Sequence, residues 1–310
     1  MITTVTLNAA IDKTYLLPNL PTGRATRVDR MYAYPGGKGV NVARAAACFG
    51  LRCAATGFLA GNNGRYIASE LDKRGIERHF VEADGESRIC LTIIDESSGR
   101  ITELLEPGPT ASPEQIETLK EHIVRLADTS EYMVFSGSLT QGVPASFYAE
   151  MIRVVQAKGV PVVLDTSGEP LLRALNAKPF LIKPNETEFE QIIGRKADRE
   201  SDRTDAARRL MDQGVSCVLL TLGGDGAIAG CYGQLYRIRT PEVAVVNTVG
   251  CGDSLVAGML AGLTRKLPIE SCLRLAAAAG TANAMTPEAG QFDPAQVESL
   301  LERVDIQPIY

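Results

Sequence analysis

Residues 157–165, AKGVPVVLD, and residues 212–223, DQGVSCVLLTLG, carry the pattern that decides the fold. In each segment a stretch with helical spacing ends at a glycine, Gly159 or Gly214, and a short apolar run follows directly. A glycine after the last helical residue is a common helix stop, and a short apolar run is typical of a strand buried on both faces. The repeated order of helix, glycine and strand predicts a mostly parallel sheet between layers of helices.

The same pattern extends along most of the chain. Helical spacing is seen at 144–158 and 205–213, next to these strands. At 310 residues, one large α/β domain is the expected organisation, covering residues 1–310. The apolar runs that we interpret as buried strands are TVTL at 4–7, YMVFS at 132–136, PVVLD at 161–165, FLIKPN at 180–185 and CVLLTLG at 217–223.

Two segments, about 13–34 and 88–105, do not follow this pattern. The first has a Pro/Gly turn between two apolar stretches, and the second has the turn ESSG between RICLTIID and RITELL. Both patterns are typical of antiparallel hairpins. We expect the two hairpins to form a small sheet over one end of the main domain, as a lid. The alternative is that they are edge strands of the main sheet.

Composition narrows the classes of protein that the chain can be. The formal net charge is −5 with a pI of about 5.3, and no run is rich in Lys or Arg. A nucleic-acid-binding protein usually carries a basic patch, so we expect no nucleic-acid partner. The two histidines, His79 and His122, stand in polar segments, which argues against a zinc centre or a Ser-His-Asp triad.

The cysteines and the length of the apolar runs indicate the compartment. The seven cysteines are odd in number, widely spaced and never arranged as CxxC, so free thiols in a reducing cytoplasm are expected. The N-terminus lacks the charged lead and apolar core of a signal peptide, and no run reaches a membrane-spanning length. We therefore expect a cytoplasmic protein without a membrane partner.

Residues 245–263, VVNTVGCGDSLVAGMLAGL, predict a phosphate-binding turn. An apolar strand should end here, a loop of small residues should follow, and a helix should begin near Cys251. Gly250 and Gly252 let the backbone N–H groups of the helix start approach an anion. Asp253 would repel a resting phosphate, so we interpret it as the base that takes a proton from an attacking hydroxyl. The alternative is an Asp that only stabilises the helix dipole.

Residues 34–50, YPGGKGVNVARAAACFG, predict a second glycine-rich turn that opens a helix. The spacing is neither that of a Walker loop nor that of a dinucleotide-binding loop. Gly37 allows close backbone contact with a polyhydroxy ligand, Lys38 can reach a phosphate, and Asn41 offers both a donor and an acceptor to sugar hydroxyls. A purely structural turn is the alternative.

Three further strand ends carry polar residues. Asp12 follows the first apolar run, where a carboxylate can bind two vicinal hydroxyls. Asn185 and Glu188 are three residues apart and can share a helix face that holds a hydrated Mg²⁺, while the glycine-rich stretch 221–227 can line a nucleotide. A helix cap and a hairpin turn are the alternatives for these two stretches.

Together these stretches resemble the phosphofructokinase B branch of the ribokinase-like sugar kinases. The N-terminal signature GGKGVNVA stands at 36–43 and the C-terminal signature NTVGCGDSLVAG at 247–258. The resemblance implies a three-layer Rossmann-like ribokinase fold with a small β-sheet lid, and a homodimer in which the lid strands clasp each other. It also implies ATP and Mg²⁺, with Asp253 as catalytic base and the amides of Gly250, Cys251 and Gly252 as anion hole.

Within that family the chain looks most similar to kinases of phosphorylated ketohexoses. The resemblance places Lys183 and, less closely matched, Asn283 on the nucleotide side with Asn185, and Glu188 beside Mg²⁺ through water. It assigns the remaining positions to sugar contacts at Asp12, Gly37, Asn41 and Ser136, to the substrate phosphate at Arg27, Lys38 and Arg88, and to the nucleotide at Thr221, Gly223 and Gly226.

The substrate that we expect first is fructose 1-phosphate, partly because the ending RVDIQPIY resembles some 1-phosphofructokinases. Tagatose 6-phosphate is the alternative, followed by fructose 6-phosphate. A catalytically silent sugar-phosphate sensor is a rival of another class, and a kinase of unphosphorylated sugars or nucleosides is a further one. The basic residues Arg27, Lys38 and Arg88 argue for a phosphorylated substrate because they supply countercharges.

The chain departs from the family pattern at Ala9, Thr140 and Cys251. Cys251 places a thiol at a helix N-terminus, where the dipole is expected to favour thiolate. We therefore expect oxidation or alkylation of Cys251 to inactivate the protein. The alternative is that Cys251 is a small buried residue and that the other thiols react first.

Overall fold

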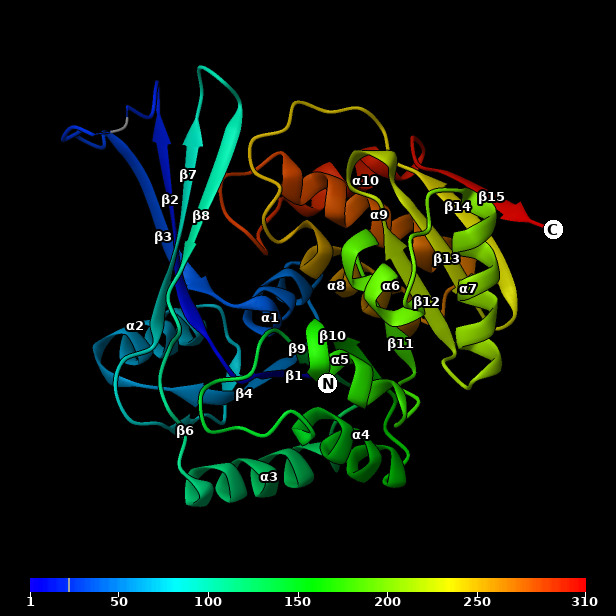
Figure 1. The fold of residues 1–310 in the computed structure, drawn as a ribbon, viewed down its shortest axis with the longest axis horizontal. Helices are drawn as coiled ribbons and strands as arrows, with labels where there is room; N and C mark the ends of the chain where they lie inside the picture. The colour runs from blue at the N-terminus through cyan, green and yellow to red at the C-terminus, as the bar shows by residue number, and fades with distance from the viewer. Residues whose placement is uncertain (22) are drawn as a thin grey trace.

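A mostly parallel sheet forms the centre of the molecule. The computed structural model describes residues 1–21 and 23–310. Within them eleven strands join this sheet, in the order β15-β14-β13-β12-β11-β10-β9-β1-β4-β5, with β6 also beside β4 (Figure 1). The strands from β12 to β5 are parallel, and β13, β14 and β15 extend one side antiparallel. Their bounds are β1 (Ile2–Thr6), β4 (Cys53–Leu59), β5 (Glu77–Arg78), β6 (Val81–Glu82), β9 (Tyr132–Ser136), β10 (Val162–Asp165), β11 (Leu181–Ile182), β12 (Cys217–Thr221), β13 (Ala227–Cys231), β14 (Gln234–Arg239) and β15 (Asp305–Ile309).

Helices cover both faces of this sheet, so the fold has the three layers that the sequence predicts. One buried apolar cluster packs a face of the sheet against α1 (Lys38–Cys48), α2 (Gly61–Lys73), α8 (Cys251–Thr264), α9 (Ile269–Ala284) and α10 (Pro294–Leu301). A second cluster packs the other face against α3 (Pro113–Ala127), α4 (Phe147–Ala157), α5 (Gly168–Leu175), α6 (Glu186–Ile193) and α7 (Glu200–Asp212).

A separate sheet, which we call the lid sheet, stands at one end of the main sheet (Figure 1). In the described part of the chain it has four strands in the order β3-β2-β7-β8. The hairpins β2–β3 and β7–β8 are antiparallel, and β2 runs parallel to β7. The predicted small sheet is therefore confirmed, and the hairpins are not edge strands of the main sheet. The bounds are β2 (Ala10–Leu17), β3 (Arg30–Gly36), β7 (Arg88–Asp95) and β8 (Arg100–Leu105).

Two predicted strands differ from the structure. The run FLIKPN forms only the two residues of β11, because Pro184 has no N–H for a ladder and Asn185 already caps α6. The apolar run before Gly250 forms no strand, since residues 240–250 belong to no helix or strand. Val245 is 59% exposed there, so its apolar side chain does not fill the sheet.

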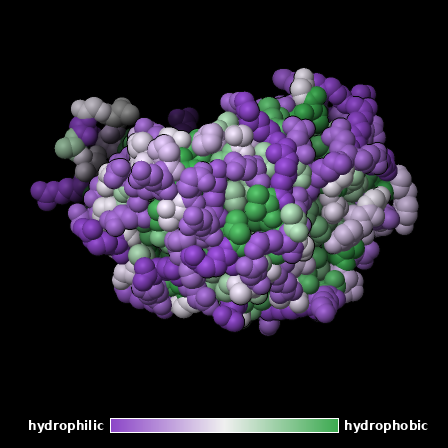
Figure 2. All heavy atoms as spheres, turned by 90° about the horizontal axis from the view of Figure 1, so that it is seen from below, coloured by the Kyte–Doolittle hydropathy of each residue, from purple (hydrophilic) through white to green (hydrophobic). Residues whose placement is uncertain are grey.

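The outer faces of the helices are expected to be polar, because their apolar faces pack against the sheet. The face below α3 and α4 is mainly hydrophilic, with small hydrophobic groups between the polar ones (Figure 2). Among the described residues no helix combines the length and the apolar character needed to cross a membrane. All seven cysteines are free thiols, as predicted.

Candidate active site

The start of α8 combines a left-handed glycine with a buried carboxylate. Gly250 precedes the helix with φ of 80°, and a Cβ on it would lie 2.6 Å from the Cβ of Ala289. Both the backbone angle and the contact therefore require glycine. The N–H of Cys251 donates to the carbonyl of Thr248 at 3.4 Å. The first N–H groups of a helix have no partner within it, so the next amides, of Gly252 and Asp253, can face an anion.

Asp253 is the third residue of α8 and is only 5% exposed. It makes no side-chain cap on the helix. Its Oδ2 accepts a hydrogen bond of 3.0 Å from Nδ2 of Asn41 on α1. Burial raises the pKa of Asp253 to about 7, and the charge of Asp165 acts in the same direction. An Asp that only stabilises the helix dipole must be ionised, and burial disfavours that form, whereas a base with this pKa can exchange a proton at neutral pH.

Beside Asp253 lies a cluster of two lysines and two carboxylates. Lys38 Nζ lies 2.8 Å from Asp165 Oδ1 and 3.8 Å from Glu188 Oε1, and Lys183 Nζ lies 3.3 Å from Asp165 Oδ2. Although burial opposes ionisation, Lys183 and Lys38 hold the pKa of Asp165 below its usual value. Burial acts to lower the pKa of Lys38, but the negative charges of Asp165 and Glu188 outweigh it, so this pKa is raised. Lys38 and Asp165 are therefore both held in their charged forms next to the start of α8.

Asp12 lies on the lid sheet rather than at the end of a main-sheet strand. It is buried on β2, and a Cβ on Gly36 would collide with its carboxylate, so this glycine of β3 makes the room. Burial raises the pKa of Asp12 to about 6, although Arg44 and Arg88 act to lower it. Because Asn41 hydrogen-bonds to Asp253 and also neighbours Asp12, it brings the lid carboxylate and the α8 carboxylate to one place.

The other residues expected at the sugar and its phosphate lie on several different elements of the fold. Arg88 begins β7 and donates through Nε to the carbonyl of Asn8 at 3.2 Å. Ser136 ends β9, fully buried, beside Gly137. Gly37 precedes α1 with φ of 93°, which confirms the predicted glycine turn. Arg27 lies in the exposed connection between β2 and β3, and not in a lid strand as expected.

A cavity of about 720 Å³ opens next to the start of α8. One wall is the turn between β12 and β13, where Gly223–Asp225 form a short 3₁₀ helix. Apolar side chains also line the cavity, among them Val243 and Val245, and Val245 opens the stretch that was predicted to start with a strand. The size suits a nucleotide. Among the predicted site residues, the cavity is lined by Asn185, Thr221, Gly223, Gly226, Cys251 and Gly252.

Asn185 and Glu188 form a capping box at the start of α6. Asn185 Oδ1 accepts from the N–H of Glu188 at 2.8 Å, and Glu188 Oε2 accepts from the N–H of Asn185 at 2.9 Å. The helix-cap interpretation is therefore confirmed. Glu188 Oε1 stays outside the box and faces Lys38. The described residues contain no group of three His, Cys, Asp or Glu that could hold a metal. One carboxylate oxygen with waters and phosphates is a donor set that fits Mg²⁺.

Asn283 lies behind the site and does not line the cavity. Its Nδ2 donates to the carbonyl of Val249 at 2.9 Å, and its Oδ1 accepts from the hydroxyl of Ser254 and from the N–H of Gly290. These contacts use the amide to hold the loop before α8. The amide of Asn283 is therefore used within the protein, and its expected contact with the nucleotide stays a prediction.

The expectation of a thiolate at Cys251 is wrong. Burial raises the pKa of this thiol to about 11, and the nearby Asp253 adds to the increase, while a contact with Asn283 opposes it. At neutral pH the thiol therefore stays protonated.

Sequence reasoning missed Asp165, which holds Lys38 and Lys183 together. The signal was present, because an acidic residue ends the buried strand PVVLD, at the edge of the sheet where ligands bind. Arg44 was also missed, although it is fully buried next to the site. Its position in a helical apolar stretch gave no indication of that burial.

Comparison with known proteins agrees with this geometry. Residues 5–296 match the pfkB family of carbohydrate kinases. The tagatose-6-phosphate kinase of Staphylococcus epidermidis is 34% identical over 309 residues, 99% of each chain. Phosphofructokinase-2 from Escherichia coli is 28% identical over 97% of this chain and 98% of that one, with TM-scores of 0.91 in complex with substrates and products and 0.89 in a tetrameric inhibited form. The chain therefore belongs to the pfkB family of carbohydrate kinases.

Proposed function

We propose that this protein transfers a phosphoryl group from ATP to a hydroxyl of a ketohexose monophosphate, giving a bisphosphate. The observation that carries the proposal is the buried Asp253, at an anion-binding helix start and bordered on one side by a nucleotide-sized cavity. On the other side, Asn41 links it to Asp12 of the lid sheet. The three features together supply a base, a donor site and an acceptor site.

The transfer needs a base that accepts a proton only while the hydroxyl attacks. Asp253 takes the proton of the acceptor hydroxyl as its oxygen bonds to the γ-phosphorus of ATP, and ADP leaves with the electron pair of the broken P–O bond. Asn41 orients the carboxylate through its 3.0 Å hydrogen bond. The amides from Gly250 to Gly252, with the positive charge of Lys38, stabilise the charge on the transferring group.

Magnesium fits the donor set on the nucleotide side. Glu188 Oε1, through water, would hold the ion at the edge of the cavity that Asn185 lines. The bound ion supplies charge neutralisation for the phosphates of ATP. Lys38 and Lys183 add protein charge to the same end of the site, and Asp165 fixes both ammonium groups.

Two candidate acceptors differ in which end of the sugar already carries phosphate. Fructose 1-phosphate is the first expectation, from the motifs of the chain. Tagatose 6-phosphate is favoured by the 34% identical relative named for that substrate. The ending 303–310 does not help to choose, because β15 pairs with β14 at the end of the main sheet opposite the lid sheet (Figure 1). Arg88 and Arg27 are the basic residues that we expect at the substrate phosphate in either case.

An acceptor screen tests the proposal. Formation of ADP is followed with fructose 1-phosphate, tagatose 6-phosphate, fructose 6-phosphate, fructose and adenosine, each with Mg²⁺ and ATP. We expect kcat/KM for at least one ketohexose phosphate to exceed the values for fructose and adenosine by about a hundredfold, since charge-assisted contacts to the phosphate are lost with the unphosphorylated compounds. A preference for an unphosphorylated acceptor, or no turnover with any of them, contradicts the proposal.

We also propose that the protein forms a homodimer through the lid sheet. Both edge strands of that sheet expose large apolar side chains, including Met31 and Tyr32 on β3 and Leu104 and Leu105 on β8. Unpaired edge strands with apolar residues invite pairing with another chain. The E. coli relative has been solved as a tetramer, which agrees with an oligomeric family member. A cytoplasmic location remains a prediction, in keeping with the free thiols.

A further inference from the structure

The largest fully buried side chain of the protein belongs to a charged residue, Arg44 on α1. It is only 1% exposed. Arginine is almost never buried to this degree unless partners satisfy its charge and donors. Neither the anion site nor the nucleotide cavity contains it. The residue therefore needs an explanation of its own.

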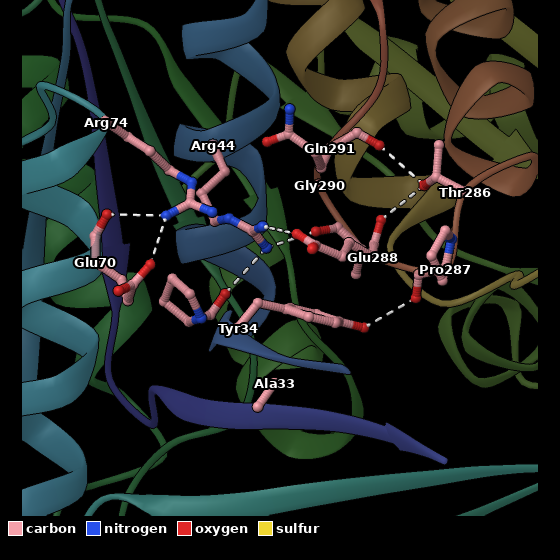
Figure 3. Close-up of polar contacts among 12 residues, drawn as sticks. Ala33, Tyr34, Arg44, Glu70, Arg74, Thr286, Pro287, Glu288, Gly290 and Gln291 are labelled. Carbon is pink, nitrogen blue, oxygen red and sulfur yellow. Dashed lines mark hydrogen bonds and ion pairs between the residues drawn. The ribbon is translucent and has the colours of Figure 1, made fainter. Parts of the chain in front are cut away.

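The partners of Arg44 come from two different parts of the fold. Nη1 donates to the carbonyl of Pro35 at 3.1 Å and to the carbonyl of Ala289 at 2.6 Å, and Nη2 pairs with Oε2 of Glu288 at 3.0 Å. The guanidinium also stacks over the ring of Tyr34, 5.1 Å from its centroid. Figure 3 shows the side chain between α1, the end of β3 and the turn after α9. Arg44 therefore bridges the base of the lid sheet and this turn.

The turn at 286–291 is held by hydrogen bonds within it. The hydroxyl of Thr286 lies within hydrogen-bond distance of the carbonyls of Glu288 and Gln291, at 2.9 and 3.0 Å. Tyr34 reaches the same turn through a 3.5 Å hydrogen bond to the carbonyl of Pro287, and Figure 3 shows these contacts side by side. The lid sheet is thus attached to the turn at two places, Tyr34 and the guanidinium of Arg44.

Both ends of this bridge touch the reaction site. At one end, Pro35 precedes Gly36, whose missing side chain makes room for the carboxylate of Asp12. At the other end, the Cβ of Ala289 lies 2.6 Å from the position that a Cβ on Gly250 would take. Gly290 packs equally closely against the backbone of Asn41. A shift of either segment therefore moves the sugar carboxylate or the anion site.

We infer that Arg44 is a positioning residue that fixes the base of the lid sheet relative to the start of α8, so that Asp12 and Asp253 face one acceptor. This rests on the proposed phosphoryl transfer. Its guanidinium fork matches two carbonyls and one carboxylate at once, which a lysine cannot reproduce. Its charge also stabilises the ionised form of Asp12. Alignment of reacting groups is sensitive, because a misplacement of about 1 Å can lower the rate about a hundredfold.

The test compares Arg44→Met, which removes the charge and the donors, with Arg44→Lys, which keeps the charge. Arg274→Met is the matched control, because Arg274 also donates to two backbone carbonyls, those of Leu301 and Val304, away from the cavity. Steady-state kinetics are measured with ATP and the best phosphosugar of the acceptor screen, on protein shown to be folded by circular dichroism.

For Arg44→Met we expect KM for the phosphosugar to rise and kcat to fall, each about tenfold or more, with KM for ATP within about threefold of wild type. Arg44→Lys should lie between, and Arg274→Met should match wild type. Folded Arg44→Met with wild-type constants overturns the inference, as does a loss of activity that Arg274→Met shares. If Arg44→Met does not fold, Arg44→Lys decides, and wild-type constants in that variant overturn it.

Hydrogen exchange of the ligand-free protein separates this inference from the proposed function. In both Arg44 variants the amides of β3 and of the turn 286–291 should exchange faster than in wild type, and in Arg274→Met they should not. If the wild type phosphorylates no ketohexose phosphate, the proposed function fails. The hydrogen-exchange measurement still tests whether Arg44 fixes β3 and the turn 286–291. Unchanged exchange in both segments contradicts the bridge.

Discussion

The carboxyl group of Asp253 depends on its burial for its chemistry. An exposed aspartate has a pKa near 4 and is a weak base, whereas burial raises the pKa of Asp253 to about 7. In the proposed mechanism the ionised form is the active base, so activity should be present above this pKa and should be lost as the pH falls through it. We expect kcat to fall about tenfold for each pH unit below about 6.5. A pH profile of kcat at saturating substrates measures this, and a flat profile from pH 6 to 9 contradicts it.

The thiol of Cys251 is expected to be unreactive in the native protein. Burial and the charge of Asp253 raise its pKa to about 11, so the nucleophilic thiolate is a small fraction at neutral pH. Alkylation with iodoacetamide at pH 7.5, followed by peptide mass spectrometry, should modify Cys251 more slowly in the native chain than in the unfolded chain, by about a hundredfold. Labelling of Cys251 ahead of the other cysteines, with parallel loss of activity, restores the earlier expectation of a redox-sensitive residue.

Residues with chemical signals of their own could be predicted, and residues defined by their surroundings could not. Asp253 was found because an acid in a phosphate-binding turn is unusual. Cys251 was misjudged because a sequence shows the helix dipole and not the desolvation that exceeds it. Arg44 was missed because nothing in its neighbours along the chain reports which carbonyls surround it in space.

At the scale of elements, the start of α8 depends on one glycine. Gly250→Ala should lower the free energy of unfolding by roughly 1–3 kcal/mol, because it adds a side chain at φ of 80° and a contact with Ala289. It should also lower kcat by displacing the anion site. Gly75→Ala is the control, since Gly75 has φ of 67° and nothing within 4 Å of an added Cβ. Thermal denaturation and kcat are measured for both.

The control Gly75→Ala should be destabilised only by the left-handed backbone angle at residue 75, and it should keep the wild-type kcat. The difference between the two variants then reports the contact with Ala289. Equal stability and equal kcat in both variants show that the turn after α9 does not support the anion site.

Several strands followed from their apolar runs, although the fully buried β4 and β13 were not predicted. The run YMVFS forms β9 with the predicted ends, and the two hairpins form the lid sheet. The apolar start of the stretch 245–263 was misread because residues that line a cavity, such as Val245, are as apolar as residues that fill a sheet. Periodicity reports that a side chain avoids water and not what covers it.

At the scale of the whole molecule, the exposed edge of the lid sheet predicts a dimer. Leu104 is 56% exposed on β8, and Leu104→Asp should give a monomer at micromolar concentration, because a buried unpaired charge opposes association. Leu267→Asp is the control, since Leu267 is 39% exposed after α8, away from the lid sheet. Light scattering after size exclusion measures the mass. A monomeric wild type, or a Leu104→Asp variant with the wild-type mass, contradicts the dimer.

The three-layer architecture could be predicted because its order of helix, glycine and strand repeats. The antiparallel extension by β13, β14 and β15 and the placement of the site between two sheets could not. Asp12 was expected at the end of a main-sheet strand, whereas the structure places it on the lid sheet. A strand leaving one sheet for another has no mark in the local sequence. The proposed acceptor site is therefore divided between parts of the fold that only the tertiary structure brings together.

Comparison of Asp253→Asn with wild type, using ATP and the preferred ketohexose phosphate, tests the central claim most directly. The amide keeps the shape of the carboxylate and cannot take the proton. Bisphosphate formation should fall by roughly 10²- to 10⁴-fold, while the Kd for ATP stays within about threefold of wild type. A variant that forms bisphosphate at the wild-type rate removes Asp253 from the mechanism and contradicts the account.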